Sequence, residues 1–448
     1  MYPDLKDLSG SYITDNDLRF IAMHIGSNLV NFEFEDANVT DRGLSVFCKE
    51  YPGLKRFRLE CNKEIGDSDE EEEVDDDDKP TDAGVIALID NCTALEDIAL
   101  FNWANITDLS MDYLSSITTL THLKLSGCRK LTTAGVMRVI QANAGLQHIE
   151  IANIKQAKTI NNFILRIGST CPGLKTLEVS LTLPLSHKIS TKAMISLVRS
   201  CPLLEELVLK GFPQTDEYLI ALSSSCPLLK SFALTGSVVT DTGLLALTRG
   251  CRKLTALILS HVTRITDVGV TGIATDCCNL IFLQVCGNQH ITDESLCAVF
   301  RACSKLTSVV LDKCSLITDR ALVTLAQVRG GLQRLHLGDN TLLTERSITA
   351  IVTFPTTLEA LYMAHMPVTD DSMMLLARYC THLKNIDIHH CNLITIRTLK
   401  ALIENCQCLR TLSVEHCTQL TRTHEVNEYL RSAAIKKIMA RGVHVMFT

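Results

Sequence analysis

Histidine residues recur near the C-terminal end of the chain at a regular spacing. His365, His390 and His416 follow one another at steps of 25 and 26 residues, and other polar side chains stand close to each of them. The complete set comprises Arg334, His336, Asp339, Tyr362, His365, Asn385, Asp387, His389, His390, Ser413, Glu415 and His416. Imidazole and carboxylate groups can hold a metal ion, exchange protons near neutral pH or bind another protein.

Three interpretations of this set stay open: a polar surface with no special role, a patch that binds a partner protein, and a metal site. The chain contains no short ligand motif such as His-Glu-x-x-His, so we assign no metal ligand and no cofactor. We expect the set to bind a partner protein, because exposed aromatic and charged side chains cluster at such sites. Imidazoles in the patch would make that binding depend on pH.

The sequence offers little support for catalysis. It has no Gly-x-Ser-x-Gly, phosphate-binding loop, Gly-x-Gly-x-x-Gly or Cys-x-x-Cys motif. The pair Cys406 and Cys408 is too closely spaced for a zinc site, and the histidines have no evident nucleophile beside them. We therefore expect a protein that is not an enzyme.

The histidines belong to a repeat that fills the chain. Between Cys201 and Ala326 the sequence carries Cys-x-x-Leu, then Leu-x-Leu, then Ile-Thr-Asp, once every 25 or 26 residues. A fixed period of this length with this leucine pattern is typical of leucine-rich repeats. The third residue of each Ile-Thr-Asp triplet marks sixteen units, at Asp15, Asp41, Asp82, Asp108, Thr133, Asn162, Thr191, Asp216, Asp241, Asp267, Asp293, Asp319, Glu345, Asp370, Ile396 and Arg422.

Each unit predicts one strand and one helix. Leu-x-Leu is a short strand with alternating faces, the Thr-Asp pair caps a helix, and apolar residues at helical spacing cover the strand. We predict a right-handed α/β solenoid shaped like a horseshoe, forming a single domain over residues 1–448. Its strands line the inner, concave face, where the candidate residues would gather in columns on adjacent strands about 5 Å apart.

Other segments interrupt or end the repeats. The acidic stretch 66–79 has no periodicity and predicts a disordered surface loop. A helix and a last strand over residues 423–448 are expected to cap the C-terminal end, whereas the N-terminal end has no such module. We expect another protein, or a segment missing from this chain, to cover it. A weaker second patch is Asp97, Phe101, Asn102 and Trp103, in which Trp103 more plausibly belongs to the core.

Composition limits the classes of function. The chain has 448 residues and a net charge of −7; without the ten acidic residues of 67–78 the balance is 43 − 40 = +3, which gives no reason to expect nucleic acid binding. No apolar run approaches the 18 residues of a membrane span, and the first residues do not resemble a secretory signal. Most of the 19 cysteines recur at two repeat positions, which favours buried thiols in a reducing compartment, the cytoplasm or the nucleus.

The repeat resembles the cysteine-containing subclass of leucine-rich repeats, most closely at Cys303–Leu322. Such repeats are found in F-box leucine-rich-repeat proteins, the substrate receptors of SCF-type ubiquitin ligases, and in F-box-less relatives of the Amn and Rad type. The resemblance implies a scaffold that recognises substrates or partners for ubiquitin-dependent turnover, with a Skp-type adaptor and a cullin ligase as indirect partners. No F-box precedes the first repeat, and the alternative is a structural subunit of a large assembly such as a ciliary or axonemal complex.

Overall fold

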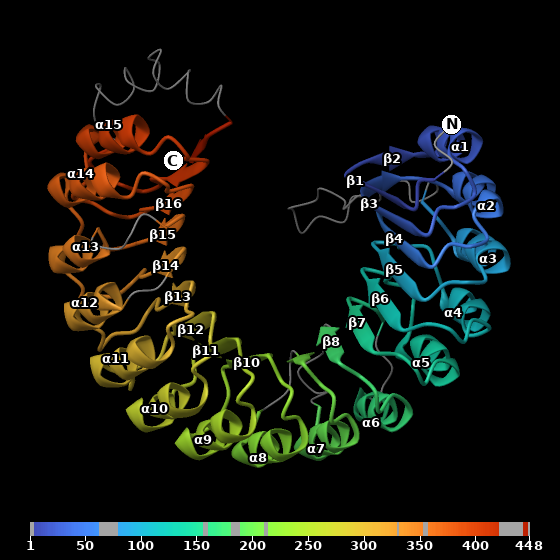
Figure 1. Cartoon of the computed structure of the whole chain (residues 1–448), viewed down its shortest axis with the longest axis horizontal. Coiled ribbons are helices and arrows are strands. Elements are labelled where there is room, and N and C mark those ends of the chain that lie inside the picture. The colour runs from blue at the N-terminus through green and yellow to red at the C-terminus, as the bar shows by residue number, and fades with distance from the viewer. Residues whose placement is uncertain are drawn as a thin grey trace. The chain divides into compact units, whose positions relative to one another are not determined.

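Each repeat forms one strand followed by one helix. The computed structural model describes residues 4–61, 79–155, 160–180, 189–209, 214–328, 331–352, 357–420 and 442–446. Contacts within the chain cluster into two units, residues 1–213 with 224–229, and residues 214–223 with 230–448. Within each unit the strands lie on one side and the helices on the other (Figure 1).

The first unit carries the N-terminal repeats. Its elements are β1 (Asp7–Gly10), β2 (Ile13–Thr14), α1 (Asp15–His24), β3 (Asn31–Asn38), α2 (Asp41–Glu50), β4 (Arg56–Cys61), α3 (Asp82–Asn91), β5 (Asp97–Phe101), α4 (Asp108–Leu114), β6 (His122–Ser126), α5 (Thr133–Ala142), β7 (His148–Ala152), α6 (Ile160–Thr170), β8 (Thr176–Ser180), α7 (Thr191–Ser200) and β9 (Glu206–Leu209). β1 and β2 both pair with β3, and from β3 to β9 each strand pairs in parallel with the next.

The second unit continues the same pattern. Its elements are most of α8 (Asp216–Ser225), β10 (Ser231–Thr235), α9 (Asp241–Gly250), β11 (Ala256–Ser260), α10 (Asp267–Asp276), β12 (Phe282–Cys286), α11 (Asp293–Ala302), β13 (Ser308–Val310), α12 (Asp319–Gln327), β14 (Arg334–His336), α13 (Glu345–Ile351), β15 (Ala360–Tyr362), α14 (Asp370–Tyr379), β16 (Asn385–Asp387), α15 (Ile396–Asn405), β17 (Thr411–Ser413) and β18 (His444–Met446). From β10 to β18 the strands are parallel and paired in order.

The predicted α/β solenoid is confirmed, and its register follows from the leucines. In the second unit Leu335, Leu361 and Ile386 occupy one sheet row and are at most 1% exposed, so the residues on either side of them face away from the helices. The described residues contain fifteen helices, and most begin at the predicted marker residue. The acidic segment lies outside the described residues apart from Lys79, and so does the predicted C-terminal helix; the last strand is present as β18.

The Thr-Asp pair has two separate functions in this fold. The threonine caps its own helix, as expected: the Thr395 hydroxyl accepts a hydrogen bond from the amide of Arg397. The aspartate instead reaches the next repeat, where Asp370 accepts from the amide of Thr395 at 2.8 Å and from its hydroxyl at 2.6 Å. In this carboxylate ladder each repeat therefore holds the one that follows it.

The carboxylate ladder is continuous from α8 to α14 in the second unit, ends before Ile396, and is interrupted in the first unit. In the second unit it runs from Asp216 to Asp370, with Glu345 replacing aspartate once. In the first unit Thr133 stands where a carboxylate is expected, and between the described residues of α6 and α7 the Ser190 amide donates to the Asn161 side chain at 2.7 Å. The predicted marker of that repeat, Asn162, is therefore one residue too late.

The repeat cysteines are core residues. Most have buried thiols that donate to a carbonyl of the preceding repeat, as Cys303 does to Cys277 at 3.5 Å. Burial raises the pKa of thiols such as Cys251 and Cys391 to about 12. All 19 cysteines are free of disulfides, and only Cys278 and Cys408 are exposed.

We expect a thiol reagent such as dithionitrobenzoate to modify two thiols rapidly in the native protein at pH 8. Of the remaining 19 − 2 = 17 thiols, 16 are buried and should react only after urea unfolds the chain. Cys286 is half-buried, and burial raises its pKa to about 11, so it should react slowly. Substituting serine for Cys278 and Cys408 should abolish the rapid phase. Rapid reaction of several further thiols in the native protein would contradict the burial described here.

Candidate functional site

The candidate residues of the second unit fall into two rows on its strand side. The first row lies on the strands: His336, Tyr362, Asp387 and Ser413 are register neighbours across β14 to β17. The His336 and Tyr362 rings stack at 3.9 Å with 16° between their planes. Arg334 and Asn385 lie at the preceding outward-facing position, where Asn385 accepts from the Thr411 hydroxyl at 2.8 Å.

The second row lies in the turns that leave the strands, which corrects the expectation that these histidines stand on strands. Asp339, His365, His390 and His416 each follow a strand by three residues and adopt a left-handed backbone with φ between 56° and 59°. The amide of His365 donates to the carbonyl of His389 at 3.1 Å, and that of His390 to Glu415 at 2.9 Å. These bonds hold successive turns in register.

The turns bring three imidazoles together in a stack. The ring centroids of His365 and His390 are 4.3 Å apart, and those of His390 and His416 are 4.5 Å apart, with planes within 13° and 21° of parallel. His389 meets this stack edge-on and also contacts the Asp387 carboxylate at 2.7 Å. Asp339 lies 4.0 Å from His365. The distances between the stacked rings, 4.3 Å and 4.5 Å, are close to the separation of about 5 Å expected for adjacent strands.

Two imidazoles of this cluster have a pKa below the ordinary value for histidine. Desolvation, together with the neighbouring His365, His416 and His389, lowers the pKa of His390. Desolvation and Arg334 likewise lower the pKa of His336. His390 and His336 are therefore protonated only at a lower pH than an ordinary imidazole.

The members of the candidate set differ in accessibility. Arg334, His365 and His416 are exposed, and the other polar members are half-buried. Ser413 is an exception, since it is 5% exposed and cannot contribute much to a contact surface. The structure thus brings together His336, Tyr362 and Asp387 on the strands with the imidazole stack in the turns.

A metal ion does not fit this arrangement. Stacked imidazoles direct their nitrogen lone pairs within parallel planes, so the three rings of the stack do not converge on one point. Among the described residues there is no group of three or more His, Cys, Asp or Glu side chains placed to hold a metal ion.

Two members of the cluster were missed by the sequence. Asp312 lies 3.9 Å from His336 and accepts from the Gly338 amide at 2.7 Å; burial raises its pKa. Lys313 has the same left-handed conformation as the histidines and lies 3.9 Å from Asp339. The signal that could have identified Asp312 and Lys313 is their position in the repeat, directly before Cys314.

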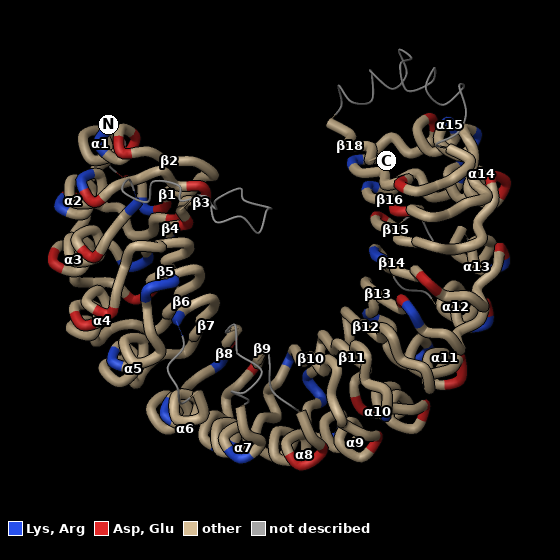
Figure 2. The backbone as a smooth tube through the Cα atoms, turned by 180° about the vertical axis from the view of Figure 1, so that it is seen from behind, with Lys and Arg blue, Asp and Glu red and all other residues tan. Residues whose placement is uncertain are grey.

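The first unit has its own polar cluster on the strand side. The carboxylate of Asp97, which is only 3% exposed, binds Arg56 at 3.0 Å and Arg58 at 2.7 Å, and both arginines lie on β4. Figure 2 shows basic (blue) and acidic (red) residues among the strands of this unit. The rings of His122 and His148 stack at 4.2 Å. Of the weaker predicted patch, Phe101 and Asn102 are half-buried and Trp103 is fully buried.

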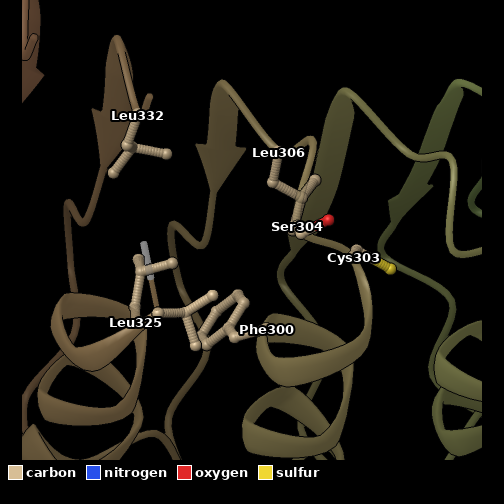
Figure 3. A pocket seen from close by; sticks show the side chains of 7 residues that line it. Phe300, Cys303, Ser304, Leu306, Leu325 and Leu332 are labelled. Carbon is tan, nitrogen blue, oxygen red and sulfur yellow. The ribbon is translucent and has the colours of Figure 1, made fainter. Parts of the chain in front are cut away.

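A cavity between α11 and α12 does not provide a ligand site. Phe300, Leu325 and Leu332 are among its lining side chains (Figure 3). Its volume is ≈ 10 Å³, about enough for one water molecule.

In the described ranges, no helix is long and apolar enough to cross a bilayer.

Comparison with known proteins identifies the repeat. A family profile described as a leucine-rich repeat matches residues 116–139. No curated protein sequence matches the chain.

Similar folds occur among solved structures. The yeast complex of Rad7 and Elc1 contains a chain that is 16% identical, with a TM-score of 0.53, covering 90% of this chain and 83% of that one. An internalin from Listeria monocytogenes is 20% identical, with a TM-score of 0.45 and coverage of 73% and 81%. A chain of the TLR13–ssRNA13 complex is 14% identical, with a TM-score of 0.42 and coverage of 92% and 75%. The repeat match and the strand–helix units together establish that this chain folds as an α/β leucine-rich-repeat solenoid.

Proposed function

We propose that this protein is a non-catalytic scaffold that recognises a partner protein through the strand side of its second unit. The observation that carries the proposal is the cluster of His336, Tyr362 and Asp387 beside the imidazole stack. These side chains are accessible and stand on a frame fixed by strand pairing and hydrogen-bonded turns. A fixed array of aromatic and ionisable groups is suited to protein recognition.

We further propose that the recognition serves ubiquitin-dependent turnover, in the cytoplasm or the nucleus. The resemblance of the repeats to F-box leucine-rich-repeat proteins and their Rad-type relatives supports this role. The solved chain of similar fold comes from a complex of Rad7 and Elc1. A Skp-type adaptor and a cullin would then contact this protein indirectly, through another protein or segment at the N-terminal end.

The test is affinity purification with mass spectrometry on three baits. The wild type is compared with a strand-side variant, Tyr362→Ala, Asp387→Ala and His390→Ala. The control is a helix-side variant of the same composition, Tyr379→Ala, Asp371→Ala and His382→Ala, all at exposed positions. We expect adaptor and cullin subunits with all three baits, and a further protein that is at least tenfold depleted only with the strand-side variant.

Other outcomes would overturn parts of the proposal. Identical captured proteins with all baits would show that the strand side is not the recognition surface. Capture of one stable particle, such as an axonemal complex, without ligase subunits would support the structural alternative and reject the role in turnover.

A further inference from the structure

A row of exposed apolar residues lies beside the imidazole stack. Leu316, Leu342 and Leu393 are 42%, 47% and 54% exposed, and Pro367 is exposed at the matching place in the repeat between them. Each directly precedes a buried residue that leads into the Thr-Asp cap, as Leu316 precedes Ile317. Four consecutive repeats therefore present an apolar group at one edge, and we call these four residues the edge row.

The edge row has sharp limits. At the equivalent position, the two preceding repeats carry Arg264 and His290, and the following repeat carries Gln419. Scattered exposed apolar residues are normal on protein surfaces, but a contiguous row bounded by polar residues marks an interaction site. The row spans the repeats that bear Lys313, Asp339, His365 and His390.

The side chains next to the edge row stand on a left-handed backbone. Lys313, Asp339, His365, His390 and His416 all have left-handed backbones two or three residues before the edge position of their own turn. Glycine adopts this conformation without strain, and Gly236 and Gly287 occupy the same position in earlier repeats. Five successive repeats here therefore place a side chain rather than glycine next to the edge row, as His261 and Asn102 do in earlier repeats.

The charge of the side chains next to the edge row depends on pH. The Lys313 ammonium lies 3.9 Å from the Asp339 carboxylate, so these two charges offset each other. The groups that face His390 are His365, His416 and His389, with Asp339, Asp387 and Glu415 as the nearby carboxylates. Acidification adds positive charge to the stack, which then attracts carboxylates.

We propose that this edge of the second unit binds an acidic amphipathic segment of a partner protein. The apolar side chains of the segment cover Leu316, Leu342, Pro367 and Leu393, and its carboxylates face the imidazoles of His365, His390 and His416. This inference rests on the proposed recognition function and specifies the chemistry of the partner. Charge complementarity makes the binding stronger in acid.

The test uses a phage-displayed library of random dodecapeptides selected on the full chain at pH 5.5. The edge variant is Leu316→Glu, Leu342→Glu and Leu393→Glu. Its control introduces the same charges at apolar residues exposed elsewhere in the second unit, Val268→Glu, Ile281→Glu and Val323→Glu. A second variant replaces His365, His390 and His416 with asparagine, which also tolerates a left-handed backbone.

We expect the selected peptides to combine Asp or Glu with Leu, Ile or Phe. Their binding should be roughly three- to tenfold tighter at pH 5.5 than at pH 7.5. Binding of the selected peptides should weaken at least tenfold in the edge variant and stay unchanged in the control variant. In the asparagine variant, binding should no longer depend on pH. In the wild type, a saturating peptide should also raise the pKa of His390, followed by NMR.

Several results would overturn the inference. The inference fails if no peptide binds the wild type in preference to the edge variant, if the selected peptides are basic, or if binding is equal at pH 5.5 and pH 7.5. Binding of a labelled oligouridylate that the asparagine variant abolishes would identify nucleic acid instead. If the edge variant captures the same cellular partner as wild type while Tyr362→Ala with Asp387→Ala loses it, the edge inference fails and the proposed function stands.

Discussion

Replacing Trp103 with alanine is expected to lower the free energy of unfolding of the first unit by about 4 kcal/mol. The indole is fully buried, meets Phe57 edge-on at 6.4 Å, and donates its N–H to the Leu59 carbonyl at 3.2 Å. The substitution removes the largest buried side chain of the described residues and leaves a buried carbonyl without that donor.

Urea unfolding followed by circular dichroism, together with amide hydrogen exchange of β4 to β6, would measure this loss. Tyr113→Ala is the matched control, because this aromatic residue of the same unit is 43% exposed and should change stability by less than 1 kcal/mol. Trp103→Phe should cost less than alanine. If alanine at position 103 left stability unchanged, Trp103 would have to be reconsidered as a surface contact of the weaker patch.

Replacing Asp370 with alanine should destabilise the second unit by about 3 kcal/mol. Its buried carboxylate accepts four hydrogen bonds, from the amides and hydroxyls of both Thr395 and Thr398. Alanine would leave these donors without this acceptor at the interface between α14 and α15. The loss is measured from the urea midpoint and from hydrogen exchange of the α15 amides, with Asp371→Ala on the exposed side of the same helix as control.

The effect of Asp370 should depend on pH in a defined direction. Burial alone would raise its pKa, but the hydrogen bonds from Thr395 and Thr398 outweigh burial and lower it. A carboxyl whose pKa is lower in the folded state stabilises the fold above its unfolded pKa of about 4, and this contribution is lost as pH falls through the folded value. Wild type and Asp370→Asn should therefore converge in stability below about pH 4, whereas a constant difference would contradict the assignment.

The sequence predicted the repeat and most helix starts because both depend on local chemistry. Leu-x-Leu alternation selects a strand, and a threonine such as Thr395 caps the helix that follows it. The function of the aspartate was not predictable from one repeat, since Asp370 bonds to a residue 25 positions later and only stacking brings the two together.

The candidate site shows the same limit. The period placed His365, His390 and His416 in one column, but the left-handed turns that carry them, and the face-to-face stacking of their rings, depend on backbone geometry. Lys313 and Asp312 were missed because the repeat was aligned on its leucines and histidines. Ser413 was included because alternation predicts direction and not how much its neighbours cover it.

The interrupted carboxylate ladder has a mechanical consequence. A chain pulled at its two ends transmits tension through each boundary between successive repeats, and the boundary with the fewest cross-links yields first. Between α6 and α7 the cross-link described at this position is neutral, from the Ser190 amide to the Asn161 side chain. From Asp216 to Asp370 every step is closed by a carboxylate. We therefore expect the repeats that carry the candidate site to keep their spacing when the chain is pulled, because a charged acceptor closes each of their steps.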